Sequence, residues 1–236
     1  MRLFQLLLDG GYAKKRIHQL FKGGKVLING QCVCDDAIEV DGQLHEVLVD
    51  GAPFSLKQHH YYLMNKPKGV VCAVKDAMHP TVCDRLPKGV VPIGRLDRNT
   101  EGLLILTDNG QLCYRLPLPQ YHVTKKYRVV VNGALTEQMV TQFMQGIEFI
   151  GGICCAPAKL DIISSSETMS EAFVTLTEGK FHQVKKMFLA VDRYVLELQR
   201  IEYGPLCLGH DLQPGQFRAL TPSEVKMLWD CAQLQY

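Results

Sequence analysis

The chain has 236 residues, of which 47% are hydrophobic, and carries a formal net charge of +2. This length is sufficient to bury a sizeable core and to hold one large and one small domain. The chain contains no run of about 18 apolar residues, and Asp9, Gly10 and Gly11 interrupt the opening MRLFQLLL too early for a signal peptide. We therefore expect a cytoplasmic protein without a membrane-spanning segment.

The nine cysteines do not follow the spacing of a disulfide framework or a zinc site. Cys32 and Cys34 have a C-x-C spacing, Cys154 and Cys155 are adjacent, and no C-x-x-C pair occurs. We expect reduced, mostly buried thiols and no bound metal.

The basic residues are clustered although the net charge is low. The clusters are Lys14 to Arg16 with Lys22 and Lys25; Lys66 with Lys68; Lys125 and Lys126 with Arg128; and Lys180 with Lys185 and Lys186. One such cluster is usually a solvated surface. Several clusters, each beside a turn or a candidate site, favour a surface that binds phosphate groups.

The first 50 residues have the pattern of two helices followed by a hairpin. Leucines at positions 3, 6, 7 and 8 predict a helix that ends at Gly10, and an apolar stripe from Ile17 to Phe21 predicts a second helix with a basic outer side. Within KVLINGQCV, Asn29 and Gly30 are a strong signal for a two-residue hairpin, because both residues tolerate positive φ.

The remaining residues follow an α+β pattern. Residues 51–58 are rich in glycine, proline and polar residues and predict a linker. Strands are expected at 61–65, 70–74, 103–107, 127–131, 159–163, 172–177 and 194–202. Helices are expected at about 136–145, at about 180–191 and after Thr221, which with Pro222 and Glu224 gives the pattern of a capping box.

The stretch GRLDRNTEGLLILTDNG, residues 94–110, has one interpretation as a calcium loop. Asp97, Asn99, Glu101 and Asp108 fit most of the EF-hand spacing. The context argues against calcium, because an EF-hand lies between two helices. Prolines and glycines precede this stretch, and the β-prone LLILT lies within it.

A second interpretation makes Asp97 a catalytic carboxylate. Arg95 and Arg98 flank it, and nearby cations favour the charged form of a carboxyl group. An ionised aspartate without a second acid or a Ser–His pair suits the work of a nucleophile or a base. By this argument alone, Asp97 is more often expected to be an ordinary turn residue than a catalytic one.

Four segments together resemble the motifs of the RsuA group of pseudouridine synthases. They are YYLMNKPKGVVC (61–72), GRLDRNTEGLLILTDNG (94–110), TKKYRVVV (124–131) and EGKFHQVKKMFLAV (178–191). In addition, KKRIHQLFKGGKVLING (14–30) resembles the small S-four-type RNA-binding module. The resemblance implies an α+β protein with this module at 1–50, a linker at 51–58 and a catalytic domain at 59–236, in which helices flank a mixed, mainly antiparallel sheet.

The resemblance also implies a catalytic set. Asp97 would be the catalytic carboxylate, and Lys185 would pair with it and hold it charged and aimed, with Lys186 as the alternative. Tyr127 would lie against the face of the uracil and help to remove the ring proton. Whether Asp97 attacks the sugar, attacks the ring or removes a sugar proton is left open by the sequence.

RNA contacts are expected on both parts of the chain. Arg95 would fill the space of the target base, which must leave the RNA stack to react. The basic clusters contribute the other predicted contacts: Lys14, Lys15, Arg16, Lys22, Lys66 and Lys186. For His182 and Gln183 we expect only helix-start and packing roles, because a lone histidine is more often structural than catalytic.

Pseudouridine formation breaks the bond between the sugar and a ring nitrogen, turns the base and rejoins it through a carbon, so no cofactor is expected. The resemblance implies a monomer that acts on small-subunit (16S) ribosomal RNA or a small-subunit assembly intermediate. Large-subunit (23S) RNA is the alternative substrate. A non-catalytic RNA-binding ribosome-assembly protein is the alternative outside the enzymes. Three segments resemble the small-subunit branch of the family more than the large-subunit branch: HVTKKYRVVV, FMQGIEF and APAKLDII.

Overall fold

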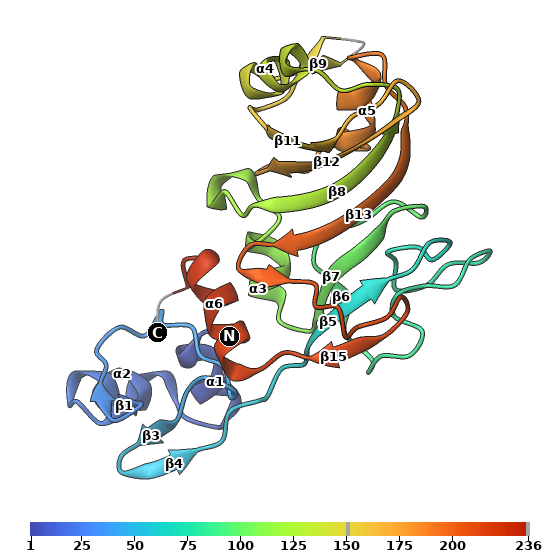
Figure 1. Ribbon diagram of the computed structural model, residues 1–236. Helices are drawn as coiled ribbons and strands as arrows, with labels where there is room; N and C mark the ends of the chain where they lie inside the picture. Colours follow the sequence, from blue (N-terminus) through green and yellow to red (C-terminus); the bar gives the residue numbers. More distant parts are fainter. Residues whose placement is uncertain (150–151, 235–236) are drawn as a thin grey trace.

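The computed structural model describes residues 1–149 and 152–234 (Figure 1). An N-terminal unit contains two helices whose apolar sides pack with a small sheet around Leu3, Leu7, Ile17, Leu20 and Val26. Its elements are α1 (Leu3–Asp9), α2 (Lys14–Lys22), β1 (Val26–Ile28), β2 (Gln31–Cys32), β3 (Val47–Val49) and β4 (Ala52–Phe54). The strands are antiparallel in the order β2-β1-β3-β4.

Two tight hairpins shape this small sheet. Asn29 and Gly30 connect β1 to β2 with φ values of 50° and 79°, which confirms the predicted hairpin. Asp50 and Gly51 connect β3 to β4 with φ values of 53° and 81°. Strand β4 therefore occupies part of the segment 51–58 that was expected to be a linker, because Asp-Gly is itself a favourable hairpin turn. Only residues 55–60 connect the two sheets.

The second sheet contains nine strands within the described residues. Its path is β11-β12-β8-β13-β7-β5-β15, and β14 and β6 are added beside β13 and β7. The strands are β5 (Tyr61–Lys66), β6 (Val91–Pro92), β7 (Glu101–Thr107), β8 (Lys125–Asn132), β11 (Lys159–Ser164), β12 (Met169–Leu176), β13 (Val195–Tyr203), β14 (Leu206–Cys207) and β15 (Phe217–Ala219). Strands β13 and β7 pair in parallel and their neighbours pair antiparallel, which confirms the mixed, mainly antiparallel sheet.

Helices cover both faces of this sheet, which explains the uninterrupted apolar run of β7. Leu104 and Leu106 belong to a core that includes residues of α4 and α5, whereas Leu103 and Ile105 belong to a core that includes residues of α3 and α6. Alternate residues of a strand point to opposite faces, so a strand covered on both sides is apolar at every position. These helices are α3 (Gly110–Arg115), α4 (Glu137–Gln145), α5 (Gln183–Leu189) and α6 (Pro222–Cys231).

The remaining short elements are η1 (Pro119–Tyr121), β9 (Glu148–Phe149) and β10 (Ile153–Cys154). The capping box predicted at the start of α6 is confirmed: Glu224 N–H donates to Thr221 Oγ1, and Thr221 N–H donates to the Glu224 carboxylate. None of the helices in the described part of the chain is long and apolar enough to cross a membrane.

Two expectations about the fold are wrong. Residues 70–74 do not form a strand, and this stretch contributes only an isolated bridge between Val71 and Thr81. The β-prone valines lie within a long irregular connection from β5 to β6, where no neighbouring strand is available for pairing. The cysteines are also not mostly buried: Cys155 is buried, and the others are exposed or half-buried.

Gly102 brings β7 against β13 and thereby positions the loop that precedes β7. Its φ is +106°, and a Cβ atom at this position would lie 2.2 Å from the Arg200 carbonyl oxygen. Only glycine combines this backbone conformation with so close an approach of two strands. The parallel pairing of β7 with β13 therefore depends on Gly102.

A buried polar cluster joins the N-terminal unit to the larger sheet. The Asp41 carboxylate accepts hydrogen bonds from His59 and from the Tyr61 hydroxyl, which in turn accepts one from Asn109 at 2.8 Å. Burial alone would raise the pKa of Asp41, but the hydrogen bonds from His59 and Tyr61 lower it overall. The charged carboxylate is thus stabilised at the junction of the two units.

Candidate active site

Asp97 lies in the loop between β6 and β7, and hydrogen bonds from its surroundings fix this loop. The Leu96 N–H donates to Cys72 Sγ at 3.3 Å, and the Thr100 N–H donates to the Asp97 carbonyl at 3.0 Å. The first bond ties the loop to the connection that follows β5, and the second closes a tight turn. The backbone that carries the Asp97 carboxylate is therefore held from two directions.

Lys66 adds a third constraint from beneath the loop. Its ammonium group donates to the carbonyl oxygens of Pro67, Arg98 and Thr100 at 3.0, 3.2 and 2.9 Å. The side chain is fully buried at 0% exposure, so the prediction that Lys66 contacts RNA is wrong. Lys66 is buried because it is the last residue of the buried strand β5, although its charge alone would favour the surface. Burial lowers the pKa of Lys66, and the nearby negative groups, Asp97 among them, oppose this shift.

The Asp97 carboxylate contacts two side chains from the start of α5. Lys185 Nζ donates a hydrogen bond to Oδ2 at 2.7 Å, and His182 Nε2 lies 3.4 Å from Oδ1. The side chains of Asp97, Lys185 and His182 are 25%, 32% and 41% exposed. A charge-assisted hydrogen bond therefore holds the carboxylate while leaving it accessible to a ligand.

Lys186, the alternative partner of Asp97, points elsewhere. Successive residues of a helix differ by about 100° in direction, so Lys185 and Lys186 cannot both face the Asp97 loop. The Lys186 ammonium lies 5.6 Å from the ring centre of Phe149 and 5.2 Å from that of Phe181. The side chain is half-buried among these aromatic rings.

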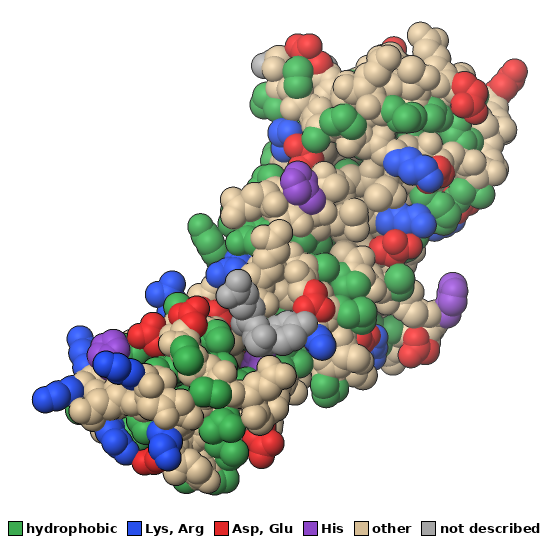
Figure 2. Space-filling model, turned by 90° about the vertical axis from the view of Figure 1, so that its left-hand side faces the viewer, with side chains coloured by type: hydrophobic (Ala, Val, Ile, Leu, Met, Phe, Trp, Pro, Cys, Tyr) green, Lys and Arg blue, Asp and Glu red, His purple; other side chains and the backbone are tan. Residues whose placement is uncertain are grey.

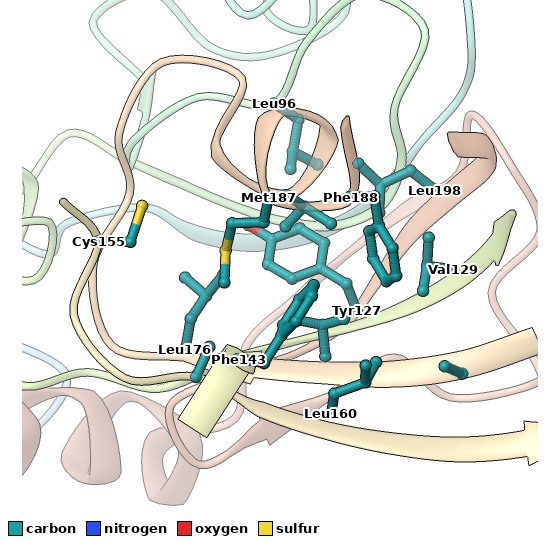
Figure 3. Packing of buried hydrophobic residues seen from close by; sticks show 14 of the residues in the cluster. Leu96, Tyr127, Val129, Phe143, Cys155, Leu160, Leu176, Met187, Phe188 and Leu198 are labelled. Atoms are coloured by element: carbon teal, nitrogen blue, oxygen red, sulfur yellow. The ribbon is translucent and has the colours of Figure 1, made fainter. Parts of the chain in front are cut away.

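A cavity of about 70 Å³ opens beside Asp97, and its lining includes Arg95, Tyr127 and Lys185. The predicted catalytic residues, which are distant in sequence, thus come together in one cavity. Tyr127 is only 9% exposed, and most of its ring packs near Leu96 and Met187 (Figure 3). Arg95 is exposed at the rim. Lys180 also lines the cavity, where its ammonium pairs with Glu178.

Two further basic groups are buried near Tyr127. Arg200 is the cross-strand partner of Tyr127 and donates from Nε to the Leu103 carbonyl at 2.8 Å. Lys125, on the same strand as Tyr127, donates to the Thr177 carbonyl at 3.3 Å. Burial, and secondarily the charge of Arg200, lowers the pKa of Lys125 to about 8. Both side chains are thus held by carbonyl oxygens of neighbouring segments.

The calcium interpretation of residues 94–110 is wrong. Asp97 precedes β7 and Asp108 follows it, so the two acids lie at opposite ends of a strand of seven residues, about 20 Å in length. Asp108 accepts a hydrogen bond from His60 N–H at 2.7 Å. Burial alone would raise the pKa of Asp108, but the hydrogen bonds from His60 lower it overall. The two carboxylates therefore cannot share one ion.

The basic residues predicted to bind RNA on the N-terminal unit are exposed. Figure 2 shows Lys and Arg side chains gathered over this unit. Lys14, Lys15, Arg16 and Lys22 all belong to α2, whose opposite side is buried in the core of the unit. Arg16 also forms an exposed ion pair with Asp50 at 2.7 Å.

His182 is the site residue that the sequence interpretation missed. It occupies the N-cap position of α5, as expected for a helix start, but its side chain makes no capping hydrogen bond and contacts Asp97 instead. The spacing of His182 and Lys185, three residues apart at the start of an expected helix, was the available signal. Gln183 is buried and donates to Glu178 at 2.6 Å, in agreement with a packing role.

Comparison with known proteins gives a consistent result. The RNA pseudouridylate synthase family matches residues 60–190. An uncharacterized RNA pseudouridine synthase of Bacillus subtilis, YtzG, is 38% identical over 97% of this chain and 98% of its own length. Ribosomal small subunit pseudouridine synthase A of Escherichia coli is 36% identical over 86% of this chain and 89% of its own length. A crystal structure of a pseudouridylate synthase, 30% identical, superposes with a TM-score of 0.67 over 97% of this chain and 99% of that one.

Proposed function

Because the chain belongs to the RNA pseudouridylate synthase family, we propose that it converts a uridine of small-subunit ribosomal RNA into pseudouridine. Membership of this family identifies the protein as an RNA pseudouridine synthase, which is an isomerase. Several similar bacterial proteins, from Escherichia coli, Yersinia pestis and Vibrio cholerae, are named ribosomal small subunit pseudouridine synthase A. Ribosomal RNA, and the 16S RNA in particular, is therefore the substrate that we propose.

The observation that carries the proposal is the pairing of Asp97 with Lys185 at 2.7 Å in the cavity lined by Tyr127. The reaction breaks the bond from ribose to N1 of uracil and forms a bond from ribose to C5. The C5 proton leaves and N1 gains one, so the atoms balance without a cofactor. Such a reaction needs a carboxylate fixed near the sugar, and we assign this role to Asp97. Lys185 holds the carboxylate in place through its hydrogen bond to Oδ2.

Tyr127 and Arg95 act on the base in this proposal. The exposed edge of Tyr127 faces the cavity, where the flipped uracil packs against it and its hydroxyl takes part in removal of the C5 proton. Stacking on an aromatic side chain is worth about 1–3 kcal/mol per base. The exposed guanidinium of Arg95 at the cavity rim fills the gap left in the RNA stack.

The N-terminal unit supplies RNA affinity in this proposal. We assign residues 1–50 to an S-four-type RNA-binding domain and residues 59–236 to the catalytic domain, with Lys14, Lys15, Arg16 and Lys22 on phosphate groups. The exposed basic side of α2 and the hairpin that follows it support this assignment. Lys186 is assigned as a further RNA contact at the edge of the catalytic domain. The protein acts in the cytoplasm as a monomer, on ribosomal RNA or a small-subunit assembly intermediate.

Mapping of pseudouridine in ribosomal RNA, with and without this protein, tests the proposal. We expect one pseudouridine to disappear from 16S RNA when the gene is deleted and to return with the wild-type protein but not with an Asp97→Asn variant. Loss of a site from 23S RNA would instead favour the large-subunit alternative. An unchanged map, together with a defect in subunit assembly, would favour a non-catalytic assembly protein.

A further inference from the structure

His182 has a backbone conformation that its position in the chain does not require. Its φ and ψ are 54° and 33°, in the left-handed region that non-glycine residues rarely adopt. At a helix N-cap this residue usually has an extended backbone and accepts a hydrogen bond through its side chain. His182 does neither, since no capping bond is made. The strained backbone therefore serves another purpose, as is common at functional sites.

That conformation directs the imidazole ring toward Asp97. Nε2 lies 3.4 Å from Asp97 Oδ1, the oxygen that Lys185 does not bind. The ring of Phe181 stacks on the imidazole, with ring centres 3.9 Å apart and planes inclined by 19°. Backbone and stacking together fix the direction of the imidazole. The contact to Asp97 is thus made by a ring whose direction both the backbone and the stacked neighbour favour.

A single contact from Lys185 leaves the carboxylate free to rotate. The χ2 torsion of aspartate has a broad, roughly two-fold preference, and an ammonium group is a point charge that does not select an orientation. A second contact on the other oxygen fixes the plane of the carboxylate. We propose that His182 is a positioning residue that, with Lys185, clamps both oxygens of Asp97 so that the carboxylate faces the bound nucleotide.

This inference rests on the proposed function, because it assigns the orientation of Asp97 a role in pseudouridine formation. A misplacement of about 1 Å in a catalytic group is sufficient to cost about 100-fold in rate. We expect the effect of losing His182 to appear in the chemical step and not in the affinity for RNA.

The test compares His182→Gly and His182→Gln with the wild-type protein. Glycine adopts the left-handed conformation without strain, so His182→Gly removes the ring and preserves the fold. We expect the single-turnover rate of His182→Gly to fall about 10- to 100-fold, with the dissociation constant for RNA unchanged within about two-fold. Glutamine presents an amide nitrogen near the position of Nε2, so His182→Gln should recover most of the rate.

His122→Gly is the matched control. His122 also has a left-handed backbone, with a φ of 48°, and is exposed but does not line the cavity. Its replacement should leave the single-turnover rate unchanged. A wild-type rate in His182→Gly would overturn the inference, as would a loss confined to RNA affinity or a loss that His182→Gln does not recover.

A crystal structure of His182→Gly separates this inference from the proposed function, because it needs no substrate. We expect the Asp97 carboxylate to rotate or to occupy two orientations. One fixed orientation, with Oδ2 still 2.7 Å from Lys185 as in the wild-type protein, would contradict the clamp. If the wild-type protein forms no pseudouridine in any ribosomal RNA, the proposed substrate is wrong, and the crystal structure still decides the role of His182.

Discussion

Replacement of Lys66 by methionine tests whether the buried lysine holds the loop that carries Asp97. Lys66→Met keeps a similar length and apolar stem but leaves the carbonyl oxygens of Pro67, Arg98 and Thr100 without their donor. Hydrogen bonds to a charged group contribute about 1.5–3 kcal/mol each, and relief from burying the ammonium offsets part of their loss. We therefore expect the free energy of unfolding to fall by about 3 kcal/mol, which corresponds to ~6–12 °C in Tm for a chain of this size.

Urea unfolding and single-turnover assays of Lys66→Met measure both consequences. Because Arg98 and Thr100 closely follow Asp97 in the chain, the loop should also shift, and the rate should fall at a temperature where the variant remains folded. Lys68→Met is the control, since Lys68 is exposed and two residues away, and its stability should remain within about 0.5 kcal/mol of wild type. Equal stability of Lys66→Met and Lys68→Met would refute the reasoning.

Two further predictions concern the other basic residues. Lys125 has a pKa of about 8 in the folded chain against an ordinary value of 10.5, so the unfolded chain binds more protons between these values and stability should rise with pH in that window. Between pH 7.5 and pH 10, the free energy of unfolding of Lys125→Met, measured with urea, should rise by up to about 3 kcal/mol less than that of the wild-type protein. An identical rise in both proteins would contradict the lowered pKa of Lys125. On α2, replacing Lys14, Lys15 and Arg16 together by alanine should weaken RNA binding and reduce the salt dependence by about one unit of slope per lost phosphate contact. Filter-binding titrations at several salt concentrations measure this, and unchanged affinity and slope would exclude α2 from the RNA surface.

The contact between Asp97 and Lys185 was predicted from the resemblance of two motifs to those of a known family. Asp97 and Lys185 were assigned from motifs that are 88 residues apart, and the structure brings their side chains within 2.7 Å. The apolar run of β7, the Asn29–Gly30 hairpin and the capping box of α6 were predicted from local sequence patterns instead. In the hairpin and the capping box, neighbouring residues alone determine the conformation.

Three other features that depend on distant parts of the chain were not predicted. The charge of Lys66 indicated a surface, but its burial follows from the strands and the Asp97 loop around it. The valines of residues 70–74 have high β propensity but lack a partner strand. His182 was expected to have only a helix-start role, but its contact with Asp97 joins the start of α5 to a loop 85 residues earlier in the chain. Tertiary contacts decided all three.

The most direct measurement of the central claim is pseudouridine formation by Asp97→Asn on the RNA that the wild-type protein modifies. Asparagine preserves the shape of the side chain but removes the charge that Lys185 pairs with. We expect product below detection, with folding and RNA affinity retained. Asp108→Asn, at the other end of β7, should keep wild-type turnover because Asp108 contacts His60 and Lys57 and does not line the cavity beside Asp97. Robust turnover by Asp97→Asn would contradict the assignment of Asp97 as the catalytic carboxylate.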